Sequence, residues 1–139
     1  MNLFLDSSAL AKRYVEETGS QRLQELLDAA SSLGVAVIAT TEVVSALCRR
    51  RREGSLTRAQ YEQTRAALFQ DITGASVVGL DEKVVARAID LLERWPLRSS
   101  DSLHVACAAE WSCDLFVTAD ERQSRAARKH GLRVELLPA

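Results

Sequence analysis

The stretch DLFVTADERQSRAARKHGLRVELL, residues 114–137, contains the pattern that decides the fold. Its apolar run at 115–118 has the length of a buried strand and is followed at once by Asp120. The next dozen residues have apolar positions at helical spacing, and a second apolar run follows at 133–137. A strand, a helix and a strand in this order predict two parallel strands joined by a crossover helix.

The same alternation extends over the rest of the chain. Short apolar runs rich in β-forming residues occur at 3–5, 35–39 and 76–80. Between them lie segments whose apolar residues recur every three or four positions, which predicts helices at 8–17, 20–30, 41–53, 57–72, 81–95 and 100–111. Gly19, Gly34, Gly54 and Gly131 are expected to mark helix ends. The sequence thus predicts an α/β protein, a three-layer α/β/α sandwich with a central five-stranded parallel sheet, forming a single domain over residues 1–139.

The composition excludes several classes of function. The chain has 18 basic and 19 acidic residues, so its net charge of -1 gives no general attraction to nucleic acid, and a polyanion has to be met by a local basic patch. The three cysteines show no metal-binding spacing and are expected to be reduced packing residues. No apolar run approaches the roughly 20 residues that cross a bilayer, and the first residues do not resemble a signal peptide. We therefore expect a cytoplasmic protein without a membrane partner.

Four acidic residues fall at corresponding places in the predicted fold. Asp6 ends the first strand, and Glu42 opens the helix after the second. Asp101 opens the helix that follows the loop at 95–100, and Asp120 follows the fourth strand. Parallel α/β sheets bind ligands beyond the carboxyl ends of their strands, where loops and helix N-termini converge. All four side chains are therefore expected at this edge of the sheet.

Helix capping is the alternative explanation for each of these acids taken alone. An acid at a helix start stabilises the helix by roughly 0.3 to 1 kcal/mol. Three of the four helices, however, have hydroxyl residues that can cap them instead, namely Ser7 or Ser8, Thr40 or Thr41, and Ser99 or Ser100. We therefore expect Asp6, Glu42 and Asp101 to be free of a capping role, whereas Asp120 remains an easy cap.

Clustered carboxylates repel one another unless a cation lies between them. Oxygen ligands without a nearby imidazole or thiolate favour Mg²⁺, with Mn²⁺ as the alternative, over Zn²⁺. Such an ion lowers the pKa of a bound water and neutralises charge on a leaving oxygen, which suits hydrolysis of a phosphodiester. The acids therefore predict a metal-dependent phosphodiesterase.

Other families with an acid after the first strand fit less well. A haloacid-dehalogenase-like phosphatase needs a second Asp two residues after the first, and that position is Ser8. A receiver domain takes its phosphate after the third strand, where this chain offers only Asp81. The glycine-rich loop of nucleotide-binding folds is absent. A non-catalytic module that binds RNA or protein would not need the full set of four acids.

Four blocks in order resemble the PIN domain family, and specifically the VapC-type ribonuclease toxins of VapBC toxin–antitoxin systems. They are LDSSALAKRYVEETGS, TTEVVSALCRRRREG, SSDSLHVACAAE and FVTADERQSRAARKHGLRV. The resemblance implies a Mg²⁺-dependent endoribonuclease in which Asp6, Glu42, Asp101 and Asp120 are the catalytic and metal-binding residues. It also implies an RNA substrate, a homodimer and inhibition by a VapB-like antitoxin, with strands one, two and four close together in the sheet. A stand-alone PIN-domain nuclease of RNA processing is the alternative.

Two hydroxyl residues are candidates for orienting the carboxylates or a bound water. Ser7 stands where many members of the family have Thr, and a helix cap is an equally good interpretation of it. Thr118 lies two residues before Asp120, so both point to the same side of the sheet. Ordinary β-packing explains Thr118 about as well.

Arg49 is the candidate for contacting an RNA phosphate. It lies seven residues after Glu42 and so on the same line of that helix, whereas Arg50, Arg51 and Arg52 are better explained as a solvated helix end. A weaker basic rim comprises Lys12, Arg13, Arg98, Arg122 and Arg125. His104, one turn after Asp101, could orient a carboxylate or act as a general base, but a packing or surface residue is the commoner explanation for such a histidine and is the one expected.

Overall fold

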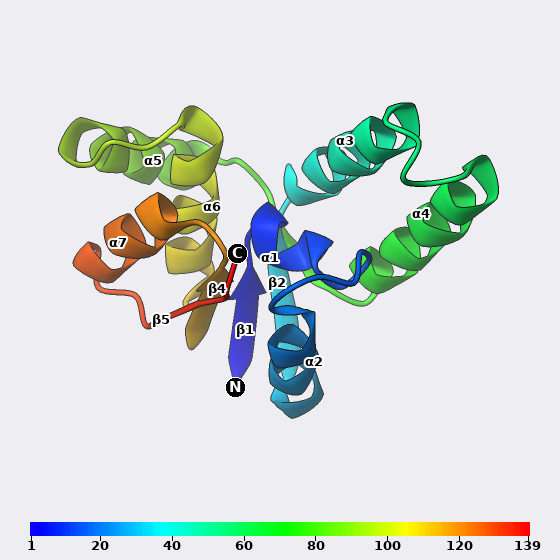
Figure 1. The fold of residues 1–139 in the computed structure, drawn as a ribbon. Coiled ribbons are helices and arrows are strands. Elements are labelled where there is room, and N and C mark those ends of the chain that lie inside the picture. Colours follow the sequence, from blue (N-terminus) through cyan, green and yellow to red (C-terminus); the bar gives the residue numbers. More distant parts are fainter.

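Five short parallel strands form one sheet in the order β3-β2-β1-β4-β5 (Figure 1). The computed structural model describes residues 1–139. Its strands are β1 (Asn2–Leu5), β2 (Ser32–Ala36), β3 (Ser76–Val78), β4 (Leu115–Thr118) and β5 (Val134–Leu136). All four strand pairings are parallel, which confirms the predicted sheet.

Helices cover both faces of this sheet. They are α1 (Ser7–Ala11), α2 (Ser20–Ala29), α3 (Ala39–Arg52), α4 (Arg58–Thr73), α5 (Glu82–Arg94), α6 (Ser99–Trp111) and α7 (Glu121–Lys129). Figure 1 shows α5, α6 and α7 on one side of the strands and α1 to α4 on the other, so the three-layer arrangement is confirmed. None of these helices combines the length and apolarity that a bilayer span requires.

Alternating side chains of β1 supply two separate cores. Leu3 and Leu5 belong to the core under α1 to α4, while Phe4 belongs to the core under α5 and α6. All three are fully buried. A central parallel strand is covered on both faces, and this explains why its sequence is uniformly apolar rather than alternating.

The strand order determines where a functional site can form. β1 lies between β2 and β4, with Leu5 paired with Val35 on one side and with Val117 on the other. The helices that follow these three strands, α1, α3 and α7, therefore begin at the same edge of the sheet. This edge is the upper end of the β1 arrow in Figure 1.

Two elements differ from the sequence-based prediction by three residues or more at one or both of their ends. The second strand lies at residues 32–36, not 35–39, because α3 begins earlier, with the Ile38 carbonyl accepting from the Glu42 N–H at 3.1 Å. The first helix ends at Ala11 and does not extend to residue 17. There the Lys12 carbonyl accepts from the Ser20 hydroxyl at 2.8 Å, and the Lys12 ammonium turns inward to the Thr18 carbonyl at 2.7 Å. These contacts accompany the end of the helix, since the Lys12 carbonyl accepts from the Ser20 hydroxyl and not from a backbone N–H one turn later.

Gly34 was expected at a helix end, but it lies inside β2, where it allows α6 to approach the sheet. A Cβ on this residue would stand 2.6 Å from Cζ3 of Trp111, closer than side-chain atoms pack. The indole occupies that space and also packs against Phe4, with the two ring centroids 6.0 Å apart. A side chain at position 34 would push the C-terminal end of α6 away from the strands.

Replacing Gly34 by Ala should therefore lower the free energy of unfolding by about 1 to 3 kcal/mol through overpacking. Urea denaturation measures this loss. Gly79→Ala is the matched control, because a Cβ at Gly79 meets nothing within 4 Å. Equal stability of the two variants would show that the Trp111 contact does not constrain α6.

Candidate active site

All four predicted acids line one small polar pocket at the carboxyl edge of the sheet. Its volume is about 70 Å³, and none of its nine lining residues is hydrophobic. These residues are Asp6, Ser7, Ser8, Glu42, Arg98, Asp101, His104, Asp120 and Gln123. They come from the end of β1 and from α1, α3, α6 and α7, elements far apart in the sequence that the sheet order brings together.

Asp6 lies at the bottom of the site and is the N-cap of α1. One carboxylate oxygen accepts from the Ala9 N–H at 2.9 Å and from the Ser8 hydroxyl at 2.7 Å, and the other accepts from the Thr118 hydroxyl at 2.5 Å. The expectation that a serine would cap this helix is therefore wrong. Burial raises the pKa of the Asp6 carboxyl above its ordinary value of 3.8, although these hydrogen bonds act in the opposite direction.

Asp120 caps α7, as its sequence position indicated. Its Oδ1 accepts from the backbone N–H groups of Arg122 at 2.8 Å and Gln123 at 3.1 Å. The Thr118 hydroxyl accepts from the Asp120 N–H at 3.0 Å while it donates to Asp6. Thr118 therefore joins two of the four acids through one hydroxyl, which fits the orienting role predicted for it.

Glu42 stands in the first turn of α3 with two donors on one carboxylate oxygen. The Ser7 hydroxyl donates to Oε1 at 2.6 Å, and Nε2 of His104 lies 2.5 Å from the same atom. The hydrogen bond from His104, and then that from Ser7, lowers the pKa of Glu42 below its ordinary value of 4.5. Neither Thr40 nor Thr41 caps this helix; Ile38 precedes it, and the Thr41 hydroxyl donates to the Ile38 carbonyl.

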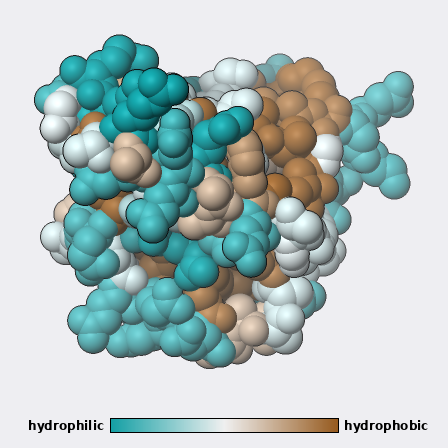
Figure 2. Space-filling view, turned by 90° about the vertical axis from the view of Figure 1, so that its right-hand side faces the viewer, coloured by the Kyte–Doolittle hydropathy of each residue, from teal (hydrophilic) through white to brown (hydrophobic).

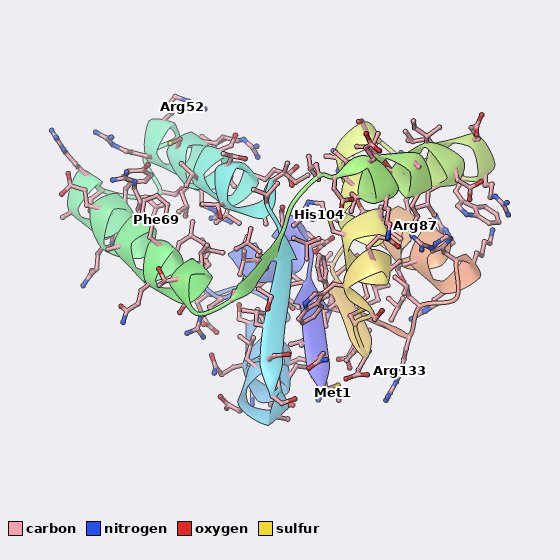
Figure 3. All side chains as sticks on the ribbon, turned by 180° about the vertical axis from the view of Figure 1, so that it is seen from behind. Met1, Arg52, Phe69, Arg87, His104 and Arg133 are labelled. Atoms are coloured by element: carbon pink, nitrogen blue, oxygen red, sulfur yellow. The ribbon has the colours of Figure 1, made fainter.

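His104 is part of the site, contrary to its interpretation as a packing residue. Its side chain is buried and reaches Glu42 and the Ser7 hydroxyl, the latter at 3.1 Å, whereas Nδ1 has no hydrogen-bond partner. Figure 3 labels it where α6 meets the carboxyl edge of the strands. The available signal was its spacing of three residues after Asp101, which puts both side chains on one face of α6.

Asp101 is buried in the first turn of α6 and is paired with an arginine of its own chain. The Arg98 guanidinium lies 3.1 Å from Oδ2 and 3.4 Å from Oδ1, and Gln123 Nε2 donates to Oδ1 at 3.4 Å. The same guanidinium is 3.7 Å from Asp120. Arg98, not Ser99 or Ser100, precedes α6 at the N-cap position. One exposed arginine thus partly neutralises two of the acids.

The donor chemistry of this pocket fits a hard cation such as Mg²⁺. Four carboxylates and two serine hydroxyls face it. The His104 imidazole also lines the pocket, but its Nε2 is engaged with Glu42 and Ser7, so oxygen atoms remain the available ligands. No three His, Cys, Asp or Glu side chains are arranged to hold a metal ion together in this structure. Their oxygens contact donors of the chain itself, so a metal would have to displace Arg98 from Asp101 and Asp120.

Arg49 does not share a pocket with the four acids. It lines a separate hollow of about 300 Å³ between α1 and α3, together with Glu17, Arg50 and Glu53. Its predicted contact with RNA is not tested by this placement and stays a prediction. Of the weaker basic rim, Arg13 is paired with Asp71, while Arg98 lies in the acid pocket itself.

Comparison with known proteins identifies relatives over nearly the whole chain. Residues 3–129 match the family model described as PIN domain. Ribonuclease VapC47 of Mycobacterium tuberculosis (strain CDC 1551 / Oshkosh) is 28% identical over 135 residues, covering 93% of this chain and 92% of the relative. Ribonuclease VapC46 of M. tuberculosis (strain ATCC 25618 / H37Rv) is 29% identical over 134 residues, covering 95% of both.

Solved structures share the fold at lower identity. VapBC2 from Rickettsia felis, bound to a DNA fragment from its promoter, matches with a TM-score of 0.71, 14% identity and 99% coverage of both chains. M. tuberculosis VapC20, described as a sarcin-ricin loop cleaving toxin, matches with a TM-score of 0.69 and 16% identity, covering 89% of this chain and 94% of that one.

Asp6→Asn should stabilise the metal-free protein at neutral pH. Because burial raises the pKa of Asp6, the folded chain holds this proton more tightly than the unfolded chain. Wild-type stability therefore falls as the pH rises from about 4 through the raised pKa, and Asn does not titrate. The advantage of the variant should therefore be larger at pH 7.5 than at pH 5. Urea unfolding at pH 5 and 7.5 with a chelator measures it.

Glu42→Gln should have the opposite effect. Since hydrogen bonds lower the pKa of Glu42, its carboxylate contributes stability that is present above about 4.5 and lost as the pH falls through the lowered value. The variant should be less stable than wild type at neutral pH, in the same urea experiment. If both variants were more stable than wild type at neutral pH, or both less stable, the environments assigned to the two acids would be wrong.

Proposed function

This chain belongs to the PIN domain family, and we propose that it is a metal-dependent endoribonuclease that acts as the toxin of a toxin–antitoxin pair. The observation that carries the proposal is the convergence of four acids in one polar pocket. The relatives named ribonucleases, which this chain covers almost completely, support RNA as the substrate. Cleavage would be hydrolysis of a phosphodiester bond at this pocket.

Asp6, Glu42, Asp101 and Asp120 are the residues that would hold Mg²⁺, or Mn²⁺ in its place. When bound, the ion supplies an activated water and neutralises charge on the phosphate oxygens. The chain holds each carboxylate in place for this task. Thr118 orients Asp6, while Gln123 orients Asp101.

Glu42 is held by the two donors from Ser7 and His104. With its proton on Nε2, His104 donates to the carboxylate beside the serine hydroxyl, so the Glu42 side chain is kept ionised and in one orientation. Groups that orient metal-binding carboxylates commonly contribute 10- to 100-fold to affinity or activity. Ser7 and His104 are thus proposed as positioning residues.

An antitoxin is the proposed protein partner. The structural relatives include complexes of VapBC type. In this chain, Arg98 shows that the acid pocket accepts a guanidinium, since it pairs with both Asp101 and Asp120. An antitoxin that presents a basic side chain would replace Arg98 there and block entry of metal and RNA.

We also propose a homodimer that uses the outer face of α5. Figure 2 faces the side of the molecule that carries α3 and α4, and it shows a largely hydrophilic surface with one hydrophobic area. Val85, Ile89 and Leu92 are each at least 38% exposed and recur at helical spacing along α5, beyond the buried face of that helix. On α4, by comparison, Phe69 is the one large hydrophobic residue with such exposure. An apolar helix face of this kind suits a self-complementary contact.

Ile89→Glu should convert the dimer to a monomer, because the charge would be desolvated at the interface. Light scattering coupled to gel filtration gives the mass of each species. Phe69→Glu is the matched control, since Phe69 is 42% exposed on α4. Loss of the dimer with Phe69→Glu and not with Ile89→Glu would move the interface to α4.

Nuclease activity is tested with purified protein and a pool of total RNA in Mg²⁺, Mn²⁺ or chelator. Asp6→Asn and Asp101→Asn should each reduce cleavage at defined sites by at least about 100-fold, because each removes a carboxylate from the pocket. Asp28→Asn, an exposed acid on α2, is the control and should cleave as wild type does. Cleavage that persists in chelator, or in both pocket variants, would refute the proposal.

A further inference from the structure

A basic groove leads away from the acid pocket along α7. The pocket adjoins a hollow of about 590 Å³, which shares Ser8, Arg98, Asp101 and Asp120 with it. That hollow in turn shares Arg122 and Arg125 with a smaller one of about 80 Å³, whose other lining includes Trp95 and Lys129. The three hollows therefore form one continuous path from the carboxylates to the end of α7.

The far part of this path carries positive charge without acidic partners. Arg122, Arg125 and Lys129 are exposed, and none of them forms an ion pair. They occupy positions i, i+3 and i+7 of α7, so they share one face over about 10 Å of helix axis. Glu121, at the start of the helix, is the one acid in the path beyond the metal-binding set.

Many other basic side chains of the protein are neutralised locally. Arg22 is paired with Glu135, Arg50 with Glu17, and Arg87 with Glu110. The three cations of α7 differ from unpaired basic residues elsewhere, such as Arg51 and Arg52 on α3, because they line hollows that connect with the acid pocket. We call the surface lined by Arg98, Arg122, Arg125 and Lys129 the α7 groove.

The wall of the α7 groove does not offer a free aromatic surface. Lys129 lies over the Trp95 ring, 4.6 Å from its centroid, and the indole Nε1 is buried. This contact fixes the lysine at the end of the groove. A base cannot stack where the ammonium stands, so the groove contacts charge rather than base faces.

We propose that the α7 groove binds successive phosphates of the RNA strand on one side of the cleaved bond. The proposal rests on the ribonuclease function above. A ligand that fills the whole path must satisfy the free cations and also enter a pocket of carboxylates. Any anionic ligand binds the free cations directly but enters the pocket of carboxylates only with a cation between them. The proposed ribonuclease function makes a phosphodiester chain, rather than an acidic peptide, the anion that spans both parts of the path.

A specific consequence is that the α7 groove contributes affinity without choosing the sequence. Contacts with phosphates position a strand, and contacts with base edges select it. Removing the cations should therefore weaken binding to all single-stranded RNAs alike, while the sites at which RNA is cut stay the same.

The test compares Arg122→Gln/Arg125→Gln with Arg51→Gln/Arg52→Gln, which removes the same charge from two exposed arginines at the end of α3. Arg52 is labelled at the far end of α3 in Figure 3. Cleavage of a labelled single-stranded RNA in Mg²⁺ should show KM raised about 10-fold for the α7 variant, with kcat and cut sites unchanged. Anisotropy titrations in chelator at several salt concentrations should show the slope of log K against log salt reduced by about 1.4 for this variant and unchanged for the α3 variant.

The possible results separate the two proposals. If wild type cleaves RNA and the α7 variant has an unchanged KM and salt slope, the groove proposal is wrong and the nuclease proposal stands. A loss confined to the α3 variant would overturn the groove proposal and place the strand along the end of α3 instead. If wild type neither cuts nor binds RNA, the ribonuclease function fails and the groove proposal fails with it. Urea midpoints equal to wild type show that the variants fold.

Discussion

A carboxylate at the end of the central strand determines how the rest of this site is built. Asp6 is almost fully buried, so every lone pair it turns inward needs a donor from the chain. Ala9 and Ser8 supply donors that start α1, and Thr118 supplies one that ties β1 to β4. The same side chain therefore begins a helix, links two strands and faces the pocket. Because this side chain serves both the fold and the pocket, a substitution of Asp6 is expected to change stability and activity together.

The four acids are not equivalent, because their surroundings differ. Burial disfavours the charge on Asp6, whereas two donors favour the charge on Glu42. Asp101 and Asp120 share one guanidinium, that of Arg98. A pocket in which neighbouring carboxylates are driven to opposite sides of their ordinary pKa values is a common arrangement for chemistry at neutral pH. The four carboxylates of the pocket outnumber its single guanidinium, that of Arg98, and this excess of negative charge favours a cation.

The sheet, its layers and the convergence of the four acids followed from periodic patterns and from the rule that parallel strands present ligands at their carboxyl ends. β4 agrees with its predicted bounds because Asp120 and a flanking polar segment mark its ends. The second strand was displaced by three residues, since Gly34 was interpreted as a helix end and in fact lies inside the strand. Arg98 was expected only in a weak basic rim, and Gln123 was not considered for the site. His104 had a local signal in its spacing from Asp101, but its contact with Glu42, like that of Gln123 with Asp101, depends on tertiary packing. Local sequence cannot show such contacts.

Trp111 and Asp101 lie on the same rigid helix, about 15 Å apart along its axis. The close approach of the indole to Gly34 fixes the C-terminal end of α6, and the Asp101 carboxylate lies near the N-terminal end of the same helix. A rotation of α6 by about 4° about the Trp111–Gly34 contact would move Asp101 by roughly 1 Å, a displacement large enough to disturb a reacting geometry. The absent side chain of one glycine, in the middle of β2, thus contributes to aligning the acids.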